Sequence, residues 1–543
     1  MFEPISPIRL KYIGMSTACA IIATCVFPLF LLAQPKQELI AGVPQQSPIT
    51  IASKSAPSNE ECQTRVNDSS EKLLECIQLN SLWSHLSQFQ KIANENKIDG
   101  HGYRDTGTPG YKASVAYVAG LMRQAGYHVT IQTYQINTSE VTGVPRFSTP
   151  EASYTLTRDW FVARLSGGGM LTAAIQPTVG SSNGCFPGDF ASFVPGKIVL
   201  LERGACAYDK QVANAERAGA AAIVLYNRDA QAMLGEDSKP GASGPNDGSA
   251  FQARLTRQAS IPVVVASFAV GSELDRQYAA GNAPVVHLDI RTRRRSTTDY
   301  NVIAESTFGD PRHTVVVEGH LDSIFGAGML DNASGSTTIL EIALNMAKTS
   351  TRNRLRYIWF GGEEIGLFGS AFYTQNLTNA QRKRIAFDID ADVTATPNFD
   401  IQIADPAFAF NVDQFPKNVV PQSEIGNDFF KNYFSSIGVP SQPAPFGNSG
   451  TDSNSFALIG IPDSGILTEQ DCCKGQSEVD LWGGFLGNYE GNIPSFDGGC
   501  VDMPNRWCDN LSNNDPFVFG MVSKATASVV FKMANHPFRT KHP

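Results

Sequence analysis

The strongest constraint on the fold is an alternation of apolar strands and helical segments between about residues 310 and 392. The stretch TVVVEGHLDS predicts a strand with its exit loop, Ser334 to Ala347 has helical spacing, and LRYIWF predicts the next strand. Strands that alternate with helices favour an α/β fold with a mostly parallel sheet covered on both faces. Such sheets bind ligands at the carboxyl ends of their strands, so the residues just past each strand are the first candidates for a site.

One histidine and several carboxylates follow these predicted strands. They are His320, Asp322, Asp331, Glu363, Glu364 and Asp392. Carboxylates gathered at one sheet edge would repel one another and would be costly to desolvate without a cation. The pattern therefore predicts a metal site.

Mixed nitrogen and carboxylate ligation suits zinc, and manganese or cobalt would also fit. We expect a two-metal hydrolytic centre, with His320 and Asp392 on one ion, Glu364 on the second and Asp331 bridging both. In an extended segment Glu363 would point away from Glu364, towards the attacking water, and would act as general base. Asp322 is placed to accept the other imidazole proton of His320.

The N-terminus has the features of an export signal. Arg9 and Lys11 precede an apolar run that ends in small residues near Ala33, so we expect a signal peptide over residues 1–33. An uncleaved membrane anchor is the alternative, because the run is long enough to span a bilayer. Residues 34–60 are rich in Pro, Ser and Gln and predict a linker. The export signal predicts a secreted or periplasmic protein.

The cysteines outside the signal are even in number, which favours disulfides in an exported chain. We expect the pairs Cys62–Cys76 and Cys185–Cys206. Cys472, Cys473, Cys500 and Cys508 leave three connectivities open. A net charge of −9 gives no reason to expect a nucleic-acid partner.

The middle of the chain, residues 160–290, changes to short strands and glycine-rich turns. Its stretches GCFPGDF, GKIVLLERGAC and VANAERAGAAAIVLYN resemble the protease-associated domain, a β-rich module often inserted into peptidases. The peptidase domain would then consist of residues 61–159 and 291–543.

The flanking motifs also resemble a known family. GHLDSIFGAGMLDNASGS, FGGEEIGLFGS and DADVTATPN look like the motifs of the secreted co-catalytic zinc aminopeptidases, relatives of glutamate carboxypeptidase and glutaminyl cyclase. The resemblance implies two Zn²⁺ per chain, His320, Asp331, Glu364 and Asp392 as ligands, and Glu363 as base. It also implies peptide or protein N-termini as substrates. The sequence leaves the oligomeric state and the preferred N-terminal residue open.

The sequence departs from this family near its C-terminal end. The family's fifth ligand is a His, and here CVDMPNRWCDNLSN places Asn505 at that position, with Asp502 as a second oxygen donor in the same loop. An amide is a poorer zinc donor than imidazole, so we expect a weak second metal site. A peptidase-like binding protein without turnover is one alternative, and a glutaminyl-cyclase-like enzyme is another.

Overall fold

The computed structural model describes residues 57–538 apart from 99, 180–182, 205, 230–247, 252, 254, 256, 325, 410–414, 447–450, 471–473 and 491–508. The expected signal peptide and most of the expected linker lie outside the described residues, as do Asn505, Asp502 and the last four cysteines. The segment Ala56–Pro543 forms one compact unit.

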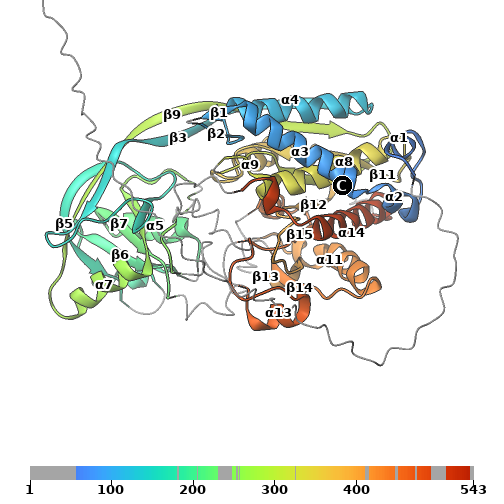
Figure 1. The fold of residues 1–543 in the computed structure, drawn as a ribbon. Helices are drawn as coiled ribbons and strands as arrows, with labels where there is room; N and C mark the ends of the chain where they lie inside the picture. Colours follow the sequence, from blue (N-terminus) through green and yellow to red (C-terminus); the bar gives the residue numbers. More distant parts are fainter. Residues whose placement is uncertain are drawn as a thin grey trace, which may run out of the picture. The chain divides into compact units, whose positions relative to one another are not determined.

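The half of the sheet that carries the predicted site residues is mostly parallel, as predicted (Figure 1). β10 pairs in parallel with β11 and with β12, and β12 pairs in parallel with β15. The strands of this half are β10 (Asp310–His320), β11 (Asn353–Phe360), β12 (Ile385–Ala391), β13 (Gln402–Ala409), β14 (Gln442–Phe446) and β15 (Asp463–Leu467). Apolar residues of β10 such as Val315, Val316 and Val317 are fully buried, as expected for a strand covered on both faces.

Helices cover this half of the sheet. In chain order, the helices of this half up to residue 346 are α1 (Asn59–Thr64), α2 (Ser70–Cys76), α3 (Leu79–Glu95), α4 (Pro109–Gln124) and α8 (Gly335–Met346). The helices after residue 346 are α9 (Phe368–Gln375), α10 (Asn379–Arg384), α11 (Val419–Ser436), α12 (Ser453–Leu458), α13 (Gln476–Trp482) and α14 (Pro516–Asn535). Helix α8 matches the predicted helix, and every residue in it is buried.

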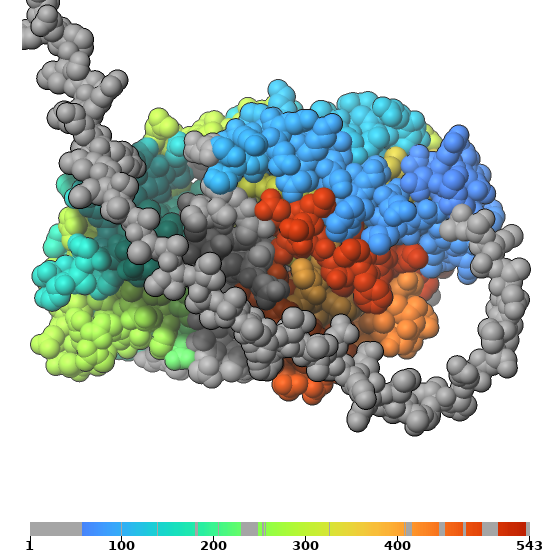
Figure 2. All heavy atoms as spheres, in the orientation of Figure 1, coloured from blue at the N-terminus to red at the C-terminus, as the bar shows by residue number. Residues whose placement is uncertain are grey.

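Helix α14 is the one described helix that is long and apolar enough to cross a membrane, and 67% of its apolar window is buried inside the protein. It contacts α2, α3 and α11, so it serves as a core helix. Figure 2 shows the same neighbours at the surface, where the C-terminal segment in red lies against the N-terminal segment in blue.

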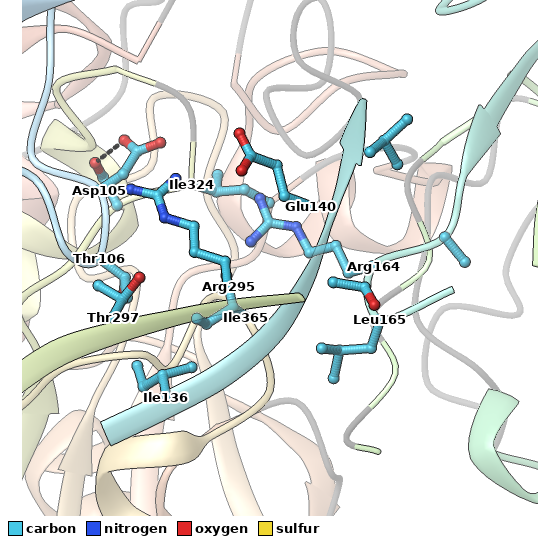
Figure 3. Close-up of a pocket in the computed structure, with 14 residues that line it drawn as sticks. Asp105, Thr106, Ile136, Glu140, Arg164, Leu165, Arg295, Thr297, Ile324 and Ile365 are labelled. Atoms are coloured by element: carbon cyan, nitrogen blue, oxygen red, sulfur yellow. Dashed lines mark hydrogen bonds between the residues drawn. The ribbon is translucent and has the colours of Figure 1, made fainter. Parts of the chain in front are cut away.

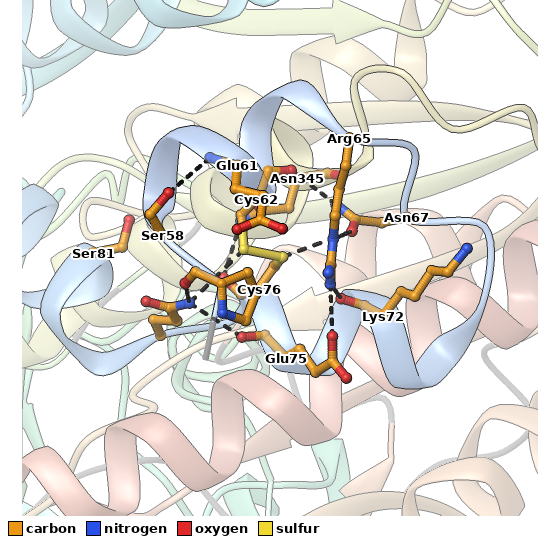
Figure 4. The surroundings of a disulfide bond; sticks show 12 residues. Ser58, Glu61, Cys62, Arg65, Asn67, Lys72, Glu75, Cys76, Ser81 and Asn345 are labelled. Carbon is orange, nitrogen blue, oxygen red and sulfur yellow. Dashed lines mark hydrogen bonds and ion pairs between the residues drawn. A yellow bond between two sulfur atoms is a disulfide. The ribbon is translucent and has the colours of Figure 1, made fainter. Parts of the chain in front are cut away.

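The predicted pair Cys62–Cys76 is a disulfide that joins α1 to α2, and Cys185–Cys206 is also a disulfide. Figure 4 shows the surroundings of the first bond. Asn67 lies between the two cysteines in sequence and donates to the carbonyl of Asn345 at 2.7 Å. The N-terminal helices are thereby tied to α8.

The inserted segment has its own strands and helices. They are β4 (Trp160–Val162), β5 (Gly169–Pro177), β6 (Ile198–Glu202), α5 (Tyr208–Arg217), β7 (Ala222–Tyr226), β8 (Val263–Ala266) and α7 (Phe268–Ala279), with a short helical turn at Pro187–Phe190. Two separate apolar clusters fill the two faces of this small sheet. The segment therefore has hydrophobic cores of its own.

Two long strands connect the halves. β3 (His128–Ser148) pairs with β9 (Val285–Glu305) from His128↔Glu305 to Ser148↔His287. β9 also pairs with β11 at one end and with β5 at the other, so the expected boundary at residue 290 falls inside a continuous strand. The length of β3 depends on this pairing with a segment 139 to 177 positions away in the sequence.

The remaining described elements are short. β1 (Lys97–Ile98) and β2 (His101–Gly102) form a two-stranded sheet, and the irregular turn Met329–Ser334 leads into α8. A further turn, Leu511–Asn513, precedes α14.

Candidate metal centre

The predicted site residues meet at one edge of the parallel sheet. His320 is the last residue of β10, Glu363 and Glu364 follow β11, and Asp392 follows β12. Asp331 comes from the turn Met329–Ser334 that leads into α8. Because β11 and β12 both pair in parallel with β10, their carboxyl ends bring these side chains together.

The centre is built around the His320 imidazole. Its Nε2 lies 2.9 Å from Asp331 Oδ1, 3.3 Å from Asp392 Oδ1 and 3.9 Å from Glu363 Oε2. Two groups of side chains could each hold a metal ion, because within each group the ligand atoms lie within 4.8 Å of one another. The first group is His320, Asp331 and Asp392, and the second is His320, Glu363 and Glu364. The first group matches one predicted metal site, and the second contains both glutamates.

The donor set fits a bound dication. His320 Nε2, Asp331 Oδ1 and Asp392 Oδ1 are buried atoms that make no hydrogen bond within the described part of the chain. Burial lowers the pKa of His320, but the charges of Asp392 and Glu363 outweigh that effect and raise the pKa well above its ordinary value. Such an anionic cluster around one imidazole requires a cation, and imidazole with carboxylates is a common zinc ligand set.

Asp322 contacts His320 differently from the prediction. The imidazole Nδ1 lies 3.1 Å from the Asp322 main-chain carbonyl oxygen and 3.6 Å from its carboxylate Oδ1. The carboxylate accepts instead from Thr106 Oγ1 at 2.7 Å and from the main-chain N–H groups of Glu363 and Glu364 at 3.3 and 3.4 Å. Asp322 therefore positions the glutamate segment, while its carbonyl orients the imidazole.

The glutamate segment is a turn, in contrast to the extended conformation that we expected. The carbonyl of Glu363 accepts from the N–H groups of Gly366 and Leu367, at 2.8 and 2.9 Å. Gly361 has no room for a side chain, because a Cβ there would meet the Tyr111 hydroxyl and come within 2.6 Å of Asp299 Oδ2. Gly362 has a φ of +66°, a conformation that glycine adopts without strain, so the chain can turn directly after the strand while both glutamates remain next to His320.

Two further buried residues, which sequence reasoning missed, hold the ligand loops. Arg104 is fully buried and donates to the carbonyls of Leu321, Ala327 and Gly328 at 2.8, 2.6 and 2.6 Å. Asp509 accepts from the N–H groups of Leu330 and Asp331 at 2.8 and 3.0 Å. Burial raises the pKa of Asp509 to about 7. Only a lone Arg in GYRDTG and the acidic residue of CDNLSN marked these positions in the sequence.

The inserted segment also reaches the centre. Arg164 Nη1 donates to the main-chain carbonyl of Glu364 at 3.0 Å, and the Arg164 N–H donates to the carbonyl of Ala253. No local pattern pointed to this contact, because the two residues are 200 positions apart.

Comparisons with known proteins agree with this geometry. The model of peptidase family M28 matches residues 301–488, and the PA domain matches residues 169–274. The chain is 31% identical over 467 residues to an aminopeptidase of Pseudomonas aeruginosa, covering 84% of this chain and 80% of that protein. The chain belongs to peptidase family M28. It is therefore a hydrolase that acts on peptide bonds, with an inserted PA domain, as the resemblance implied.

Two solved structures share the fold of this peptidase. The aminopeptidase from Aneurinibacillus sp. strain AM-1 has a TM-score of 0.63 at 20% identity, with 88% of this chain and 98% of that chain covered. BSAP, a zinc aminopeptidase from Bacillus subtilis, has a TM-score of 0.54 at 21% identity, with 84% and 95% covered. Both likenesses support the α/β sheet that carries the site.

Proposed function

We propose that this M28 peptidase is an exported zinc aminopeptidase, which removes single residues from the free N-termini of peptides. The observation that carries the proposal is the buried cluster of His320, Asp331, Glu363, Glu364 and Asp392 at the carboxyl edge of the sheet. The aminopeptidases that the chain resembles favour the exopeptidase reaction. The two disulfides favour an oxidising compartment, and with the N-terminal sequence they support export.

The site residues would divide the work as follows. His320, Asp331 and Asp392, whose ligand atoms lie together, would hold one zinc ion. Glu364, which lies beside His320 and Glu363, would hold a second together with Asp331, as the sequence pattern predicts. Bound zinc would polarise the scissile carbonyl and acidify the attacking water. Glu363 would take a proton from that water as its oxygen attacks the carbonyl carbon, and would return the proton to the leaving amine as the C–N bond breaks. Asp322 would keep Glu363 in place through its main-chain N–H.

The second zinc site is proposed to be weak. Its remaining ligand would come from Asn505 or Asp502, and neither side chain offers imidazole nitrogen. We further propose that residues 61–159 and 291–543 form the peptidase domain around an insertion at 160–290, of which the PA domain matches 169–274.

The test is the variant Glu363→Gln, with Glu424→Gln on the exposed face of α11 as matched control. Turnover is measured by release of the chromophore from leucine p-nitroanilide, and zinc by atomic absorption. Glu363→Gln should lower kcat by at least about a hundredfold with zinc content unchanged, the usual effect of losing a general base. The Glu424 variant should match the parent protein.

Near-normal turnover in Glu363→Gln would contradict the role of the base. A parent protein with neither bound zinc nor turnover would instead indicate a binding protein that kept the peptidase fold.

A further inference from the structure

A cavity of about 400 Å³ lies beside the candidate metal centre (Figure 3). One wall comes from the site loops: Ile365 follows Glu364 in sequence, and Ser323 and Ile324 follow Asp322. Thr106, which donates to the Asp322 carboxylate, lines the same wall. The cavity wall therefore includes the residues that directly follow Asp322 and Glu364 in the sequence.

The opposite wall comes from the inserted segment and the β3–β9 pair. Ala163, Arg164 and Leu165 lie just after β4, and Ile136 and Arg295 lie on the two long strands. Figure 3 shows the guanidinium groups of Arg164 and Arg295 reaching into the space above the apolar side chains. A pocket with apolar walls and a few convergent polar groups is the usual form of a ligand site.

The charged groups of this cavity differ in how they are paired within the described residues. Glu140 lines the cavity but forms an ion pair at 2.8 Å with Arg293, which does not line it. Asp105 accepts from Ser323 Oγ at 2.9 Å and from the Gly326 N–H at 3.3 Å, and burial raises its pKa well above the ordinary value. Arg295 forms no hydrogen bond or ion pair with the described residues, although its charge acts on Glu140.

We infer that this cavity holds the part of the peptide that follows the scissile bond, and that Arg295 binds a carboxylate of that part. The inference rests on the proposed aminopeptidase function. Glu140 is already paired with Arg293, so a free N-terminal ammonium would meet the Arg295 guanidinium and be repelled by it, whereas a carboxylate would be attracted. An extended peptide advances about 3.3–3.6 Å per residue, so the residue after the scissile bond would lie next to the centre, where Ile365 and Ser323 begin the cavity wall.

The carboxylate has two sources, and three substrates distinguish them. Leucyl-glutamate amide carries a side-chain carboxylate, leucyl-alanine carries a terminal carboxylate, and leucyl-alanine amide carries neither. We expect the parent protein to have a KM about fivefold lower or better for one of the first two than for the amide without a carboxylate, the scale of a partly exposed charged hydrogen bond. The substrate with the lower KM identifies the source.

The matched variants are Arg295→Ala and Arg294→Ala. Neighbouring side chains on a strand point to opposite faces, and Arg294 is an exposed residue that does not line the cavity. Arg295→Ala should bring the ratio of KM values between the carboxylate and neutral substrates close to one, whereas Arg294→Ala should keep the parent ratio. Equal KM values in the parent protein, or the same change of ratio in both variants, would overturn the inference.

If the protein is not an aminopeptidase, a binding experiment still tests the inference. If the parent protein releases leucine from none of the substrates, binding of leucyl-glutamate amide, leucyl-alanine and leucyl-alanine amide to the parent is compared by calorimetry, and the same comparison is made for Arg295→Ala. Tighter binding of a carboxylate peptide that disappears in Arg295→Ala would keep the inference, and equal binding of all three would end it.

Discussion

Replacing Arg104 with methionine should loosen the loop that carries the metal ligands. Arg104 is fully buried, and its guanidinium bonds three main-chain carbonyls between His320 and Asp331, those of Leu321, Ala327 and Gly328. Burial lowers its pKa to about 10, and the nearby charges of Asp509, Asp322 and Asp105 act against that change. The group therefore stays cationic near pH 7 and neutralises buried carboxylates.

The size of the effect follows from these contacts. Methionine has a similar length and no donor, so three buried carbonyls would lose their partner, at about 1 kcal/mol each or more. Uncompensated carboxylates would add to this, so we expect the free energy of unfolding to fall by about 3–5 kcal/mol. Arg104→Lys keeps the charge but offers a single nitrogen, so its loss should be intermediate.

Urea unfolding of the chelator-treated protein measures this free energy without a contribution from bound zinc. The exposed Arg123 on α4 provides the matched control, since Arg123→Met should change stability by less than about 0.5 kcal/mol. Competition with a chromogenic chelator should show zinc affinity reduced about tenfold or more in Arg104→Met, as for other residues that support ligands. Stability within about 1 kcal/mol of the parent and unchanged zinc affinity would refute the reasoning.

Two other predictions concern titration and the second metal. Burial, with the charge of Asp322, raises the pKa of Asp299 to about 8, so the folded protein binds a proton there that the unfolded chain has lost above about pH 4. Its contribution to stability therefore falls as pH rises towards 8, and Asp299→Asn should make the slope of unfolding free energy against pH less negative by about 1.4 kcal/mol per unit between pH 5 and 7. Parallel curves for the two proteins would contradict this assignment. Asn505→His should raise zinc content towards two ions per chain and increase peptidase activity; a parent protein with two tightly bound zinc ions, both retained in Asn505→Ala, would show that the predicted weak site does not exist.

The placement of the candidate site residues could be predicted because it depends on short local patterns in the sequence. Apolar runs of strand length end at His320 and just before Glu363 and Asp392, and parallel strands must bring their carboxyl ends to one edge. The same short-range reasoning found the helix that became α8 and the disulfides Cys62–Cys76 and Cys185–Cys206. Residue type and spacing were sufficient in each of these cases.

The support of the centre could not be predicted, because it depends on contacts between distant parts of the chain. Arg104 reaches Gly328 across 224 positions, and Arg164 of the inserted segment reaches Glu364 across 200. The Asp322 carboxylate lies 3.6 Å from the His320 imidazole and also accepts from Thr106 and from the main-chain N–H groups of Glu363 and Glu364, contacts that sequence reasoning did not predict. Sequence periodicity reports which face of an element is buried, whereas the choice of hydrogen-bond partner depends on which groups packing brings within about 3 Å.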